Sequence, residues 1–321
     1  MTAVDRTRFG ADTTTADVLS GISLDGRVAL VTGASGGLGA EAARALAESG
    51  AAVTLAVRDM AKGNGVAEAI RASTGNDRID LVQLDLTSLD SVRACAKSWL
   101  AQHGELHVLI NNAGIMACPL DRTREGWEIQ FATNHLGHFL LTALLVPALR
   151  AGAPSRIVNV SSAGHRLAGI DFEDIHFDRR DYDKWIAYGQ SKTANVLFAR
   201  ELDRRLQHDQ IRAYALHPGV IMTELARYLT PDDIKDLMNR APGDGELQFK
   251  TVETGAATEV YTATAPELAA KGGLYLEDCR IAEVAESEAA NSGYAPHAFD
   301  PDAAARLWQV SEQLLGERFD L

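Results

Sequence analysis

Short apolar runs alternate along the chain with longer segments whose hydrophobic residues recur at helical spacing. Periodicity of these two kinds separates buried strands from helices that bury one face. Their regular alternation predicts an α/β fold with a doubly wound parallel sheet and helices on both of its faces. The predicted strands are 27–31, 52–57, 79–84, 107–110, 156–160 and 212–216, and the predicted helices are 41–49, 60–72, 88–103, 122–149, 184–208 and 302–315.

Longer insertions interrupt this alternation after the fifth and sixth predicted strands, and a long tail follows residue 276. Insertions of this length are often binding loops or lids. The tail is expected to cover either a pocket or a subunit face. The expected organisation is an N-terminal extension (1–25) and a single domain (26–321) that includes the loop 163–183, the lid-like region 222–250 and the C-terminal extension 277–321.

The apolar runs are too short to indicate a membrane span. A spanning helix needs about 18 or more consecutive apolar residues, and the richest run extends only from Phe139 to Leu149. That run predicts a buried core helix that ends near Pro147. Residues 1–25 lack the basic start and apolar stretch of a secretory signal. We therefore expect no membrane anchor.

Composition narrows the class of partner. The chain has 321 residues, 46% of them hydrophobic, which suffices for one large domain. Its formal net charge of −13 argues against nucleic acid, which requires a basic surface. The three cysteines are far apart and show no metal-binding spacing, so we expect no disulfide and no metal site. A reducing, cytoplasmic location is the simplest expectation.

A glycine-rich segment follows the first predicted strand. Residues 32–39 read Thr-Gly-Ala-Ser-Gly-Gly-Leu-Gly and lead into a helix. Such glycines let the backbone approach a pyrophosphate, and the helix N-terminus offers free N–H groups to that anion. A plain strand-to-helix turn is the alternative, but the position at the first strand–helix junction favours dinucleotide binding. The residues expected at the cofactor are Gly33, Ser35, Gly37, Leu38 and Gly39.

The end of the second predicted strand bears on the choice of dinucleotide. A carboxylate there would hold the ribose 2′-hydroxyl of NAD, whereas an arginine suits the 2′-phosphate of NADP. Val57 stands where the acid is expected, and Arg58, which can pair a phosphate through two N–H groups, follows it. Asp59 is placed to neutralise Arg58 or to contact ribose itself. The sequence predicts NADP(H) as the preferred cofactor, with NAD(H) as the alternative.

Tyr188 and Lys192 are four residues apart in a predicted helix and therefore share a face. A free tyrosine has a pKa of about 10, and a nearby ammonium lowers that pKa by favouring the phenolate. The pair is thus suited to acid–base chemistry. An isolated Tyr-x3-Lys is common, so its meaning depends on the motifs around it.

Those motifs resemble the short-chain dehydrogenase/reductase family over about residues 25–225. Six independent motifs occur in the family's order, which chance does not explain. They are Thr32–Gly39, Asn111-Asn112-Ala113-Gly114, Asn134, Val160-Ser161-Ser162, Tyr188-x3-Lys192 and Pro218-Gly219-x3-Thr223.

The resemblance implies catalytic roles for four residues. Tyr188 would donate a proton to a carbonyl or remove one from an alcohol, and Ser162 would orient the reacting oxygen. Lys192 would hold the nicotinamide ribose and lower the pKa of Tyr188. Asn134 would position a water that links Lys192 to solvent.

The resemblance also implies contacts to the dinucleotide. Residues after the third strand would lie at the adenine, those after the fourth at the adenosine ribose, and those after the sixth at the nicotinamide. They are Asp85 and Leu86, then Asn112, Ala113 and Gly114, then Pro218, Gly219, Val220 and Thr223.

One spacing departs from the commonest family pattern. Ser162 and Tyr188 are 26 residues apart, about twice the separation in many members, and the excess is the segment 163–183. Together with Phe9-Gly10 and Leu141-Thr142, this segment resembles the retinol-dehydrogenase and WW-domain oxidoreductase branch, whose members often act on apolar aldehydes, ketones or alcohols. The aromatic residues of the segment either line a hydrophobic pocket or pack on the sheet.

The resulting hypothesis is an oxidoreductase that moves a hydride between NADP(H) and the carbonyl or alcohol carbon of a small apolar molecule. The alternatives are an NAD-dependent alcohol dehydrogenase of the same fold and a non-catalytic cofactor-sensing protein. Family resemblance also implies a homodimer or homotetramer that associates through the two long helices within 122–149 and 184–208. His165 is expected either to hydrogen-bond a loop backbone or to reach the substrate.

Overall fold

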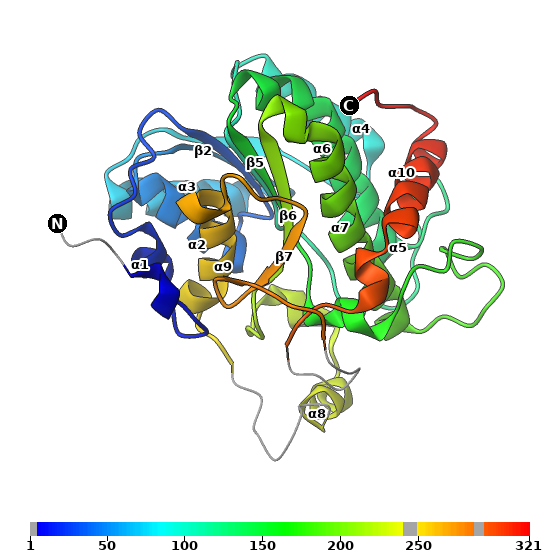
Figure 1. The fold of residues 1–321 in the computed structure, drawn as a ribbon. Coiled ribbons are helices and arrows are strands. Elements are labelled where there is room, and N and C mark those ends of the chain that lie inside the picture. The colour runs from blue at the N-terminus through cyan, green and yellow to red at the C-terminus, as the bar shows by residue number, and fades with distance from the viewer. Residues whose placement is uncertain (1–4, 240–248, 286–291) are drawn as a thin grey trace.

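One eight-stranded sheet organises the computed structural model, which describes residues 5–239, 249–285 and 292–321 (Figure 1). The strand order is β3-β2-β1-β4-β5-β6-β7-β8, in which β1 to β7 are parallel and β8 is antiparallel to β7. The strands are β1 (Val28–Thr32), β2 (Ala52–Val57), β3 (Ile79–Gln83), β4 (Val108–Asn111), β5 (Ser155–Val160), β6 (Ile211–His217), β7 (Leu274–Glu277) and β8 (Arg280–Ile281).

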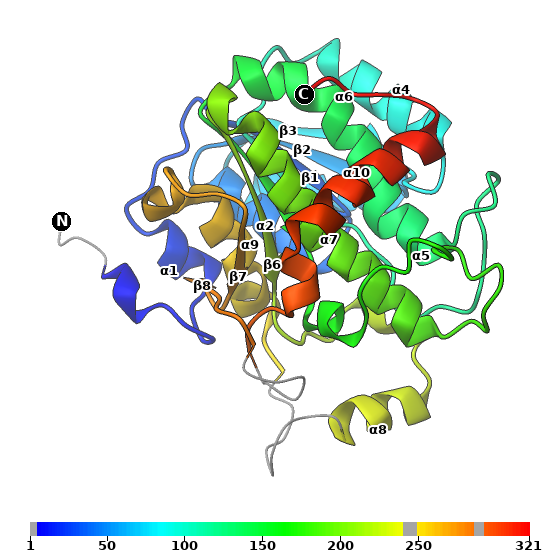
Figure 2. The same ribbon diagram turned by 45° about the vertical axis from the view of Figure 1, so that its right-hand side comes forward.

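Helices cover both faces of the sheet (Figures 1 and 2). Leu30 of β1 faces one layer, whereas its neighbours Ala29 and Val31 face the other, as the two-residue period of a strand requires. Thus the strands are buried on both sides. One layer holds α2 (Gly37–Glu48), α3 (Met60–Thr74) and α9 (Val252–Thr264), and the other holds α4 (Leu89–Leu100), α6 (Gly137–Ala151) and α7 (Lys184–Leu206).

The helix predicted over 122–149 begins later and ends later than expected. Residues 122–128 form a turn whose ends are joined by an isolated antiparallel β-bridge between the backbones of Arg122 and Glu128. The helix begins with α5 (Ile129–Phe131) and continues through a π-helical turn (Ala132–Leu136) into α6. The predicted end near Pro147 is wrong, because this proline lies on the exposed side of α6 and the helix runs on to Ala151. Proline has no N–H, so the carbonyl one turn earlier in the helix lacks its usual donor. On this exposed side of the helix, water can satisfy that carbonyl.

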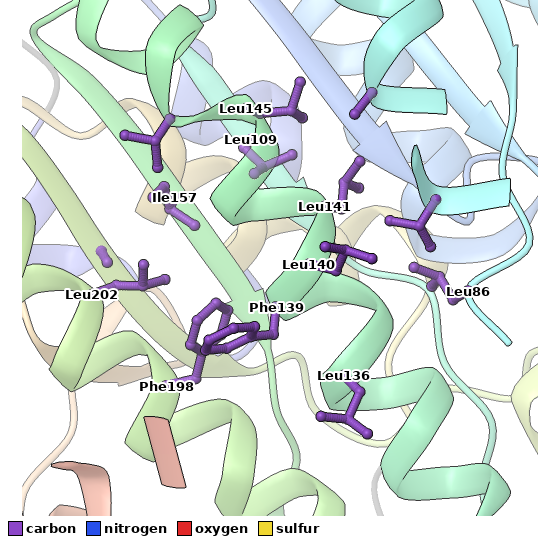
Figure 3. Close-up of a cluster of buried hydrophobic side chains, with 14 of the residues drawn as sticks. Leu86, Leu109, Leu136, Phe139, Leu140, Leu141, Leu145, Ile157, Phe198 and Leu202 are labelled. Carbon is purple, nitrogen blue, oxygen red and sulfur yellow. The ribbon is translucent and has the colours of Figure 1, made fainter. Parts of the chain in front are cut away.

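The continuous helix Ile129–Ala151 is long and apolar enough to cross a membrane by length and composition alone. However, 89% of its apolar window is buried inside the domain, as expected of a core helix. Figure 3 shows its Leu136, Phe139, Leu140 and Leu145 among core side chains from other elements.

Helix α9 and strands β7 and β8 were not predicted. The α9 segment mixes β-branched residues, glycine and alanine, so its helical apolar stripe is weak, and the two strands are short. The predicted parallel sheet is confirmed, and the unpredicted β8 adds an antiparallel strand at its edge. In addition, α2 begins at Gly37 rather than near residue 41, because the glycine-rich loop supplies the first helical turn.

The C-terminal helix α10 (Pro301–Leu315) lies across α7 and α6 (Figures 1 and 2). The ring centres of Trp308 and Phe139 are 4.7 Å apart. The guanidinium carbon of Arg205 lies 4.1 Å from the centre of the Trp308 ring. Ser311 Oγ lies 2.8 Å from Nε2 of the buried His135. The chain's own extension therefore covers a face of the two long helices that were expected to join subunits.

Replacing Trp308 by alanine should weaken the docking of α10. Trp308 is 2% exposed, and truncating a buried tryptophan costs about 3–5 kcal/mol of folding free energy. We expect a clear fall in the thermal midpoint and in the denaturant midpoint. Gln309→Ala, on the exposed side of the same helix, is the matched control. Equal midpoints for the two variants would contradict the observed packing.

Candidate active site

The predicted site residues gather at the carboxyl ends of β1, β4, β5 and β6. The strand order reverses between β1 and β4, and ligands of doubly wound sheets bind in the crevice outside such a point. Thr32 joins the two strands there, because its Oγ1 accepts the N–H groups of Asn112 at 2.9 Å and Ala113 at 3.0 Å. The loops that follow these strands are thus held together.

Two glycines of the loop, Gly33 and Gly39, leave no room for a side chain. A Cβ at Gly33 would lie 2.8 Å from Ala113 Cα, and one at Gly39 would lie 2.8 Å from the Gly33 carbonyl oxygen and collide with the Asn112 side chain. Gly36 precedes α2 without any side-chain cap. The first N–H groups of α2 therefore have no side-chain acceptor at the cap, which is the arrangement that binds a pyrophosphate.

The structure separates the two charged residues at the end of β2. The Asp59 carboxylate caps α3 by accepting the Lys62 N–H at 3.0 Å, and within the described residues it forms no ion pair with Arg58. Arg58 is exposed directly after β2. Lys62 is a further cation that the sequence reasoning missed. Its Nζ would lie 3.8 Å from a Cβ at Gly36, and it pairs with Glu224 at 2.5 Å. The four-residue spacing from Arg58 was the available signal.

The remaining predicted cofactor residues differ in what they can offer. Asp85 Oδ1 already accepts from the backbone and hydroxyl of Thr87, at 3.0 and 2.7 Å. The Leu86 side chain is buried in the core against Gly137, so only its backbone is available to a ligand. Thr223, at the start of the segment Glu224–Tyr228, would contact a Cβ at Gly37 at 3.4 Å. The loop after β6, which also holds Pro218, Gly219 and Val220, therefore reaches the glycine-rich loop.

Tyr188 and Ser162 meet at a crowded contact. The turn Ala163–Leu167 (η3) follows Ser162, and a Cβ at Gly164 would lie 2.6 Å from Tyr188 Cε1 and 3.4 Å from Ser162 Oγ. Ser162 Oγ accepts the Gly164 N–H at 3.0 Å. A Cβ at Gly189 would lie 2.9 Å from the Gly164 carbonyl oxygen. The tyrosine ring is thus fixed against the turn that carries the serine.

Asn134 lies in the π-helical turn and is fully buried. Its Oδ1 accepts the Ile115 N–H at 2.9 Å, and its Nδ2 donates to Ile115 O at 3.0 Å and to Ser191 Oγ at 2.9 Å. Ser191 Oγ in turn donates to Tyr188 O at 2.8 Å. Asn134 therefore ties the loop after β4 to α7. A π-turn is a frequent feature of functional sites, and periodicity alone does not reveal it.

Lys192 lies one turn after Tyr188 and completes the group. Its Nζ donates to Val160 O at 2.9 Å and lies 5.7 Å from the centre of the Tyr188 ring. A Cβ at Gly114 would lie 3.6 Å from this Nζ and 3.2 Å from Asn134 Oδ1. The structure thus brings together all four residues predicted to be catalytic.

Burial sets the protonation of the tyrosine and the lysine. It raises the pKa of Tyr188 to about 12, although the hydrogen bond with Ser162 lowers it, and it lowers the pKa of Lys192 to about 8. The predicted lowering of the Tyr188 pKa by Lys192 is therefore absent from the chain alone. Desolvation of the phenolate dominates, so Tyr188 holds its proton at neutral pH.

The segment 163–183 packs on the domain rather than forming a separate aromatic wall. Ile175 and Phe177 are buried, and Gln130 Nε2 donates to Tyr182 Oη at 2.9 Å. Beyond Tyr182 the surface has a hollow of about 330 Å³ lined by Pro119, Tyr182, Asp183, Lys184 and Trp185. The end of the segment therefore contributes to this recess.

Comparison with known proteins identifies the class that this fold and site define. The family model described as short chain dehydrogenase matches residues 27–234. The chain belongs to the short-chain dehydrogenase family and is an oxidoreductase. Human retinol dehydrogenase 12 is 42% identical over 299 residues, which cover 93% of this chain and 89% of that protein. This similarity confirms the predicted retinol dehydrogenase branch.

Solved structures support the same fold. A protein from Mycobacterium paratuberculosis is 36% identical, with a TM-score of 0.74 over 97% of this chain and 100% of that chain. Gluconate 5-dehydrogenase from Burkholderia cenocepacia, in complex with NADP and tartrate, is 25% identical, with a TM-score of 0.63 over 80% of this chain and 95% of that chain.

Adding one methyl group at Gly39 should disable the phosphate loop. The Cβ of Gly39→Ala would press on the Gly33 carbonyl and the Asn112 side chain, so the loop must move away from its binding position. We expect loss of measurable NADPH binding by isothermal calorimetry. Gly65→Ala is the matched control, because this glycine of α3 has open space around its Cβ position, and alanine there should stabilise the fold by about 0.4–1 kcal/mol. Unchanged NADPH affinity in Gly39→Ala would exclude this loop as the site.

Proposed function

We propose that this protein is an NADP(H)-preferring oxidoreductase that interconverts the carbonyl and alcohol forms of a small apolar molecule, with Tyr188 as the acid–base. The observation that carries the proposal is the packing of the Tyr188 ring against Gly164 and Ser162, with Lys192 one helical turn away. A protonated phenol and a serine hydroxyl then face the same space, as polarisation of one carbonyl oxygen requires.

The chain's own residues fit a dinucleotide. The uncapped start of α2 and the bare glycine surface suit a pyrophosphate, and Arg58 with Lys62 offers two cations to a 2′-phosphate. Lys192 would hold the nicotinamide ribose, with Asn112, Gly114 and the loop after β6 around it. A bound nicotinamide dinucleotide supplies or accepts the hydride.

The protein's part in the reaction is to place the carbonyl and to supply a proton. Ser162 Oγ orients the carbonyl oxygen, and Tyr188 Oη donates its proton to that oxygen as negative charge develops. In the reverse direction Tyr188 would have to act as the phenolate, the form that burial disfavours. Lys192, when protonated, stabilises the phenolate that remains.

Exposed apolar side chains surround the carboxyl edge of the sheet and favour an apolar substrate. Among them, Leu120 follows β4, Leu167 lies in the turn after β5, and Met222, 59% exposed, follows β6. Tyr228 and Phe249 extend the rim along the described part of the lid-like region, and residues 240–248 of that region lie outside the described residues.

We also propose a cytoplasmic location, which three free, buried cysteines favour. Should the protein form a homodimer or homotetramer, we propose that it associates away from the face of α6 and α7 that α10 covers. No feature of the chain favours nucleic acid as a partner.

Replacing Tyr188 by phenylalanine should abolish turnover, because the only proton donor proposed for the carbonyl is removed while the ring still fills its place. NADPH consumption with a panel of apolar ketones and aldehydes measures turnover, and calorimetry should show nearly unchanged NADPH binding. Tyr214→Phe is the matched control, since its hydroxyl donates to Leu268 O away from the site. Turnover retained by Tyr188→Phe would refute the assigned acid. Tight NADPH binding by the parent protein without turnover on any substrate would favour a cofactor sensor.

Replacing Arg58 by alanine should reduce the preference for NADPH over NADH. A charge-assisted hydrogen bond contributes about 1.5–3 kcal/mol, so the ratio of the two affinities should fall roughly tenfold to hundredfold. Lys97→Ala, which removes one exposed cation from α4, controls for net charge. Equal affinities for NADPH and NADH in the parent protein would contradict the cofactor preference and favour an NAD-dependent alcohol dehydrogenase.

A further inference from the structure

His165 connects the serine turn to the C-terminal extension. It lies in η3, three residues after Ser162, and is fully buried. Its Nδ1 lies 2.6 Å from the carbonyl oxygen of Ser162, and its Nε2 lies 3.0 Å from the backbone nitrogen of Ala295. Of the two sequence expectations, the loop hydrogen bond is the one observed, and the second partner comes from 130 residues further along the chain.

These partners assign the tautomer of the His165 ring. A backbone N–H can only donate, so Nε2 is the acceptor for Ala295 and Nδ1 carries the proton donated to Ser162 O. Burial lowers the pKa of His165 to about 4, which keeps the ring neutral and able to accept at neutral pH. The ring therefore forms both hydrogen bonds at once.

A second contact from the extension reinforces the same turn. His297 Nε2 donates to the His165 carbonyl oxygen at 2.9 Å, and that oxygen also accepts from Thr193 Oγ1 of α7 at 2.9 Å. The extension itself is held on α7, where the Arg200 guanidinium lies 4.3 Å above the ring of Phe299. The short helix Pro296–Phe299 (η7) thus spans from α7 to the turn.

We propose that His165 is a positioning residue for Ser162, and that the segment 294–297 of the C-terminal extension forms part of the active-site framework. The His165 ring holds the backbone carbonyl of Ser162 through a hydrogen bond from Nδ1, and the Ala295 N–H holds the ring through a hydrogen bond to Nε2. This inference rests on the proposed role of Ser162 as the group that orients the carbonyl.

The geometry distinguishes this role from that of an ordinary buried histidine. The His165 ring bonds to the main chain of the serine itself, and the same turn holds Gly164 against the Tyr188 ring. Movement of the turn would therefore misplace the serine hydroxyl relative to the tyrosine. Misplacement of a reacting group by about 1 Å can cost roughly a hundredfold in rate.

Two substitutions of His165 separate its hydrogen bond to Ser162 O from its hydrogen bond to the Ala295 N–H. In His165→Asn the amide nitrogen takes the place of Nδ1 and can still donate to Ser162 O. In His165→Gln the amide oxygen reaches the place of Nε2 and can accept from Ala295, but the donation to Ser162 is lost. We expect kcat to fall roughly tenfold to hundredfold in His165→Gln, with NADPH affinity unchanged. It should fall less in His165→Asn, which keeps the donation to Ser162 O and loses only the acceptor for the Ala295 N–H.

A substitution in the extension tests the other end of the connection. Ala295 has φ −73°, which proline adopts, so Ala295→Pro removes the N–H donor while its Cδ takes the place of the hydrogen and pushes the His165 ring away. It should lower kcat in the same direction as His165→Gln. Ala295→Ser keeps the N–H and is its control. Ser311→Ala removes the bond of α10 to His135 and should lower the thermal midpoint without lowering kcat.

Hydrogen exchange of the segment 162–168 gives a readout that needs no substrate. The Gly164 amide donates to Ser162 Oγ, so exchange there should accelerate in His165→Gln and Ala295→Pro and stay unchanged in Ser311→Ala. If the parent protein turns over nothing while this pattern holds, the proposed function fails and the bracing of Ser162 stands. Unchanged exchange in His165→Gln, or kcat values that track the thermal midpoints of all variants including Ser311→Ala, would overturn the inference.

Discussion

The site depends on the close approach of α7 to the turn that follows β5. At Gly164 and Gly189 the two segments are so close that only glycine fits, since a Cβ at either position would overlap atoms of the other segment. This contact sets the orientation of the Tyr188 ring relative to Ser162. Because Lys192 is one turn further along the same helix, the contact also fixes the distance from its ammonium to the phenol.

The surrounding structure maintains this contact from several directions. Asn134 links the loop after β4 to α7 through Ser191, and the Lys192 ammonium returns to the end of β5 through Val160. The segment 294–297 holds the turn after β5 through hydrogen bonds from Ala295 and His297 to His165. The chain therefore uses its C-terminal extension, which follows the part matched by the family model, to complete the support of the serine.

Patterns that depend on near neighbours were predictable. The four-residue spacing of Tyr188 and Lys192 places them on one helical face in any context, and glycines at a strand–helix junction have few other uses. Elements with weak patterns were not predictable. The α9 segment lacks a strong apolar stripe, β7 and β8 are too short to show a period, and Pro147 suggested a helix end that its exposed position made unnecessary.

The sequence by itself determined the fold class, the branch of the family and the set of residues at the site, because each of these follows from local spacing and order along the chain. Tertiary structure decided how those residues behave. The pKa of Tyr188 is raised rather than lowered, since burial of the phenol outweighs its hydrogen bond with Ser162. Lys62 pairs with Glu224 and His165 meets Ala295, because both contacts depend on distances between segments that spacing along the chain does not encode.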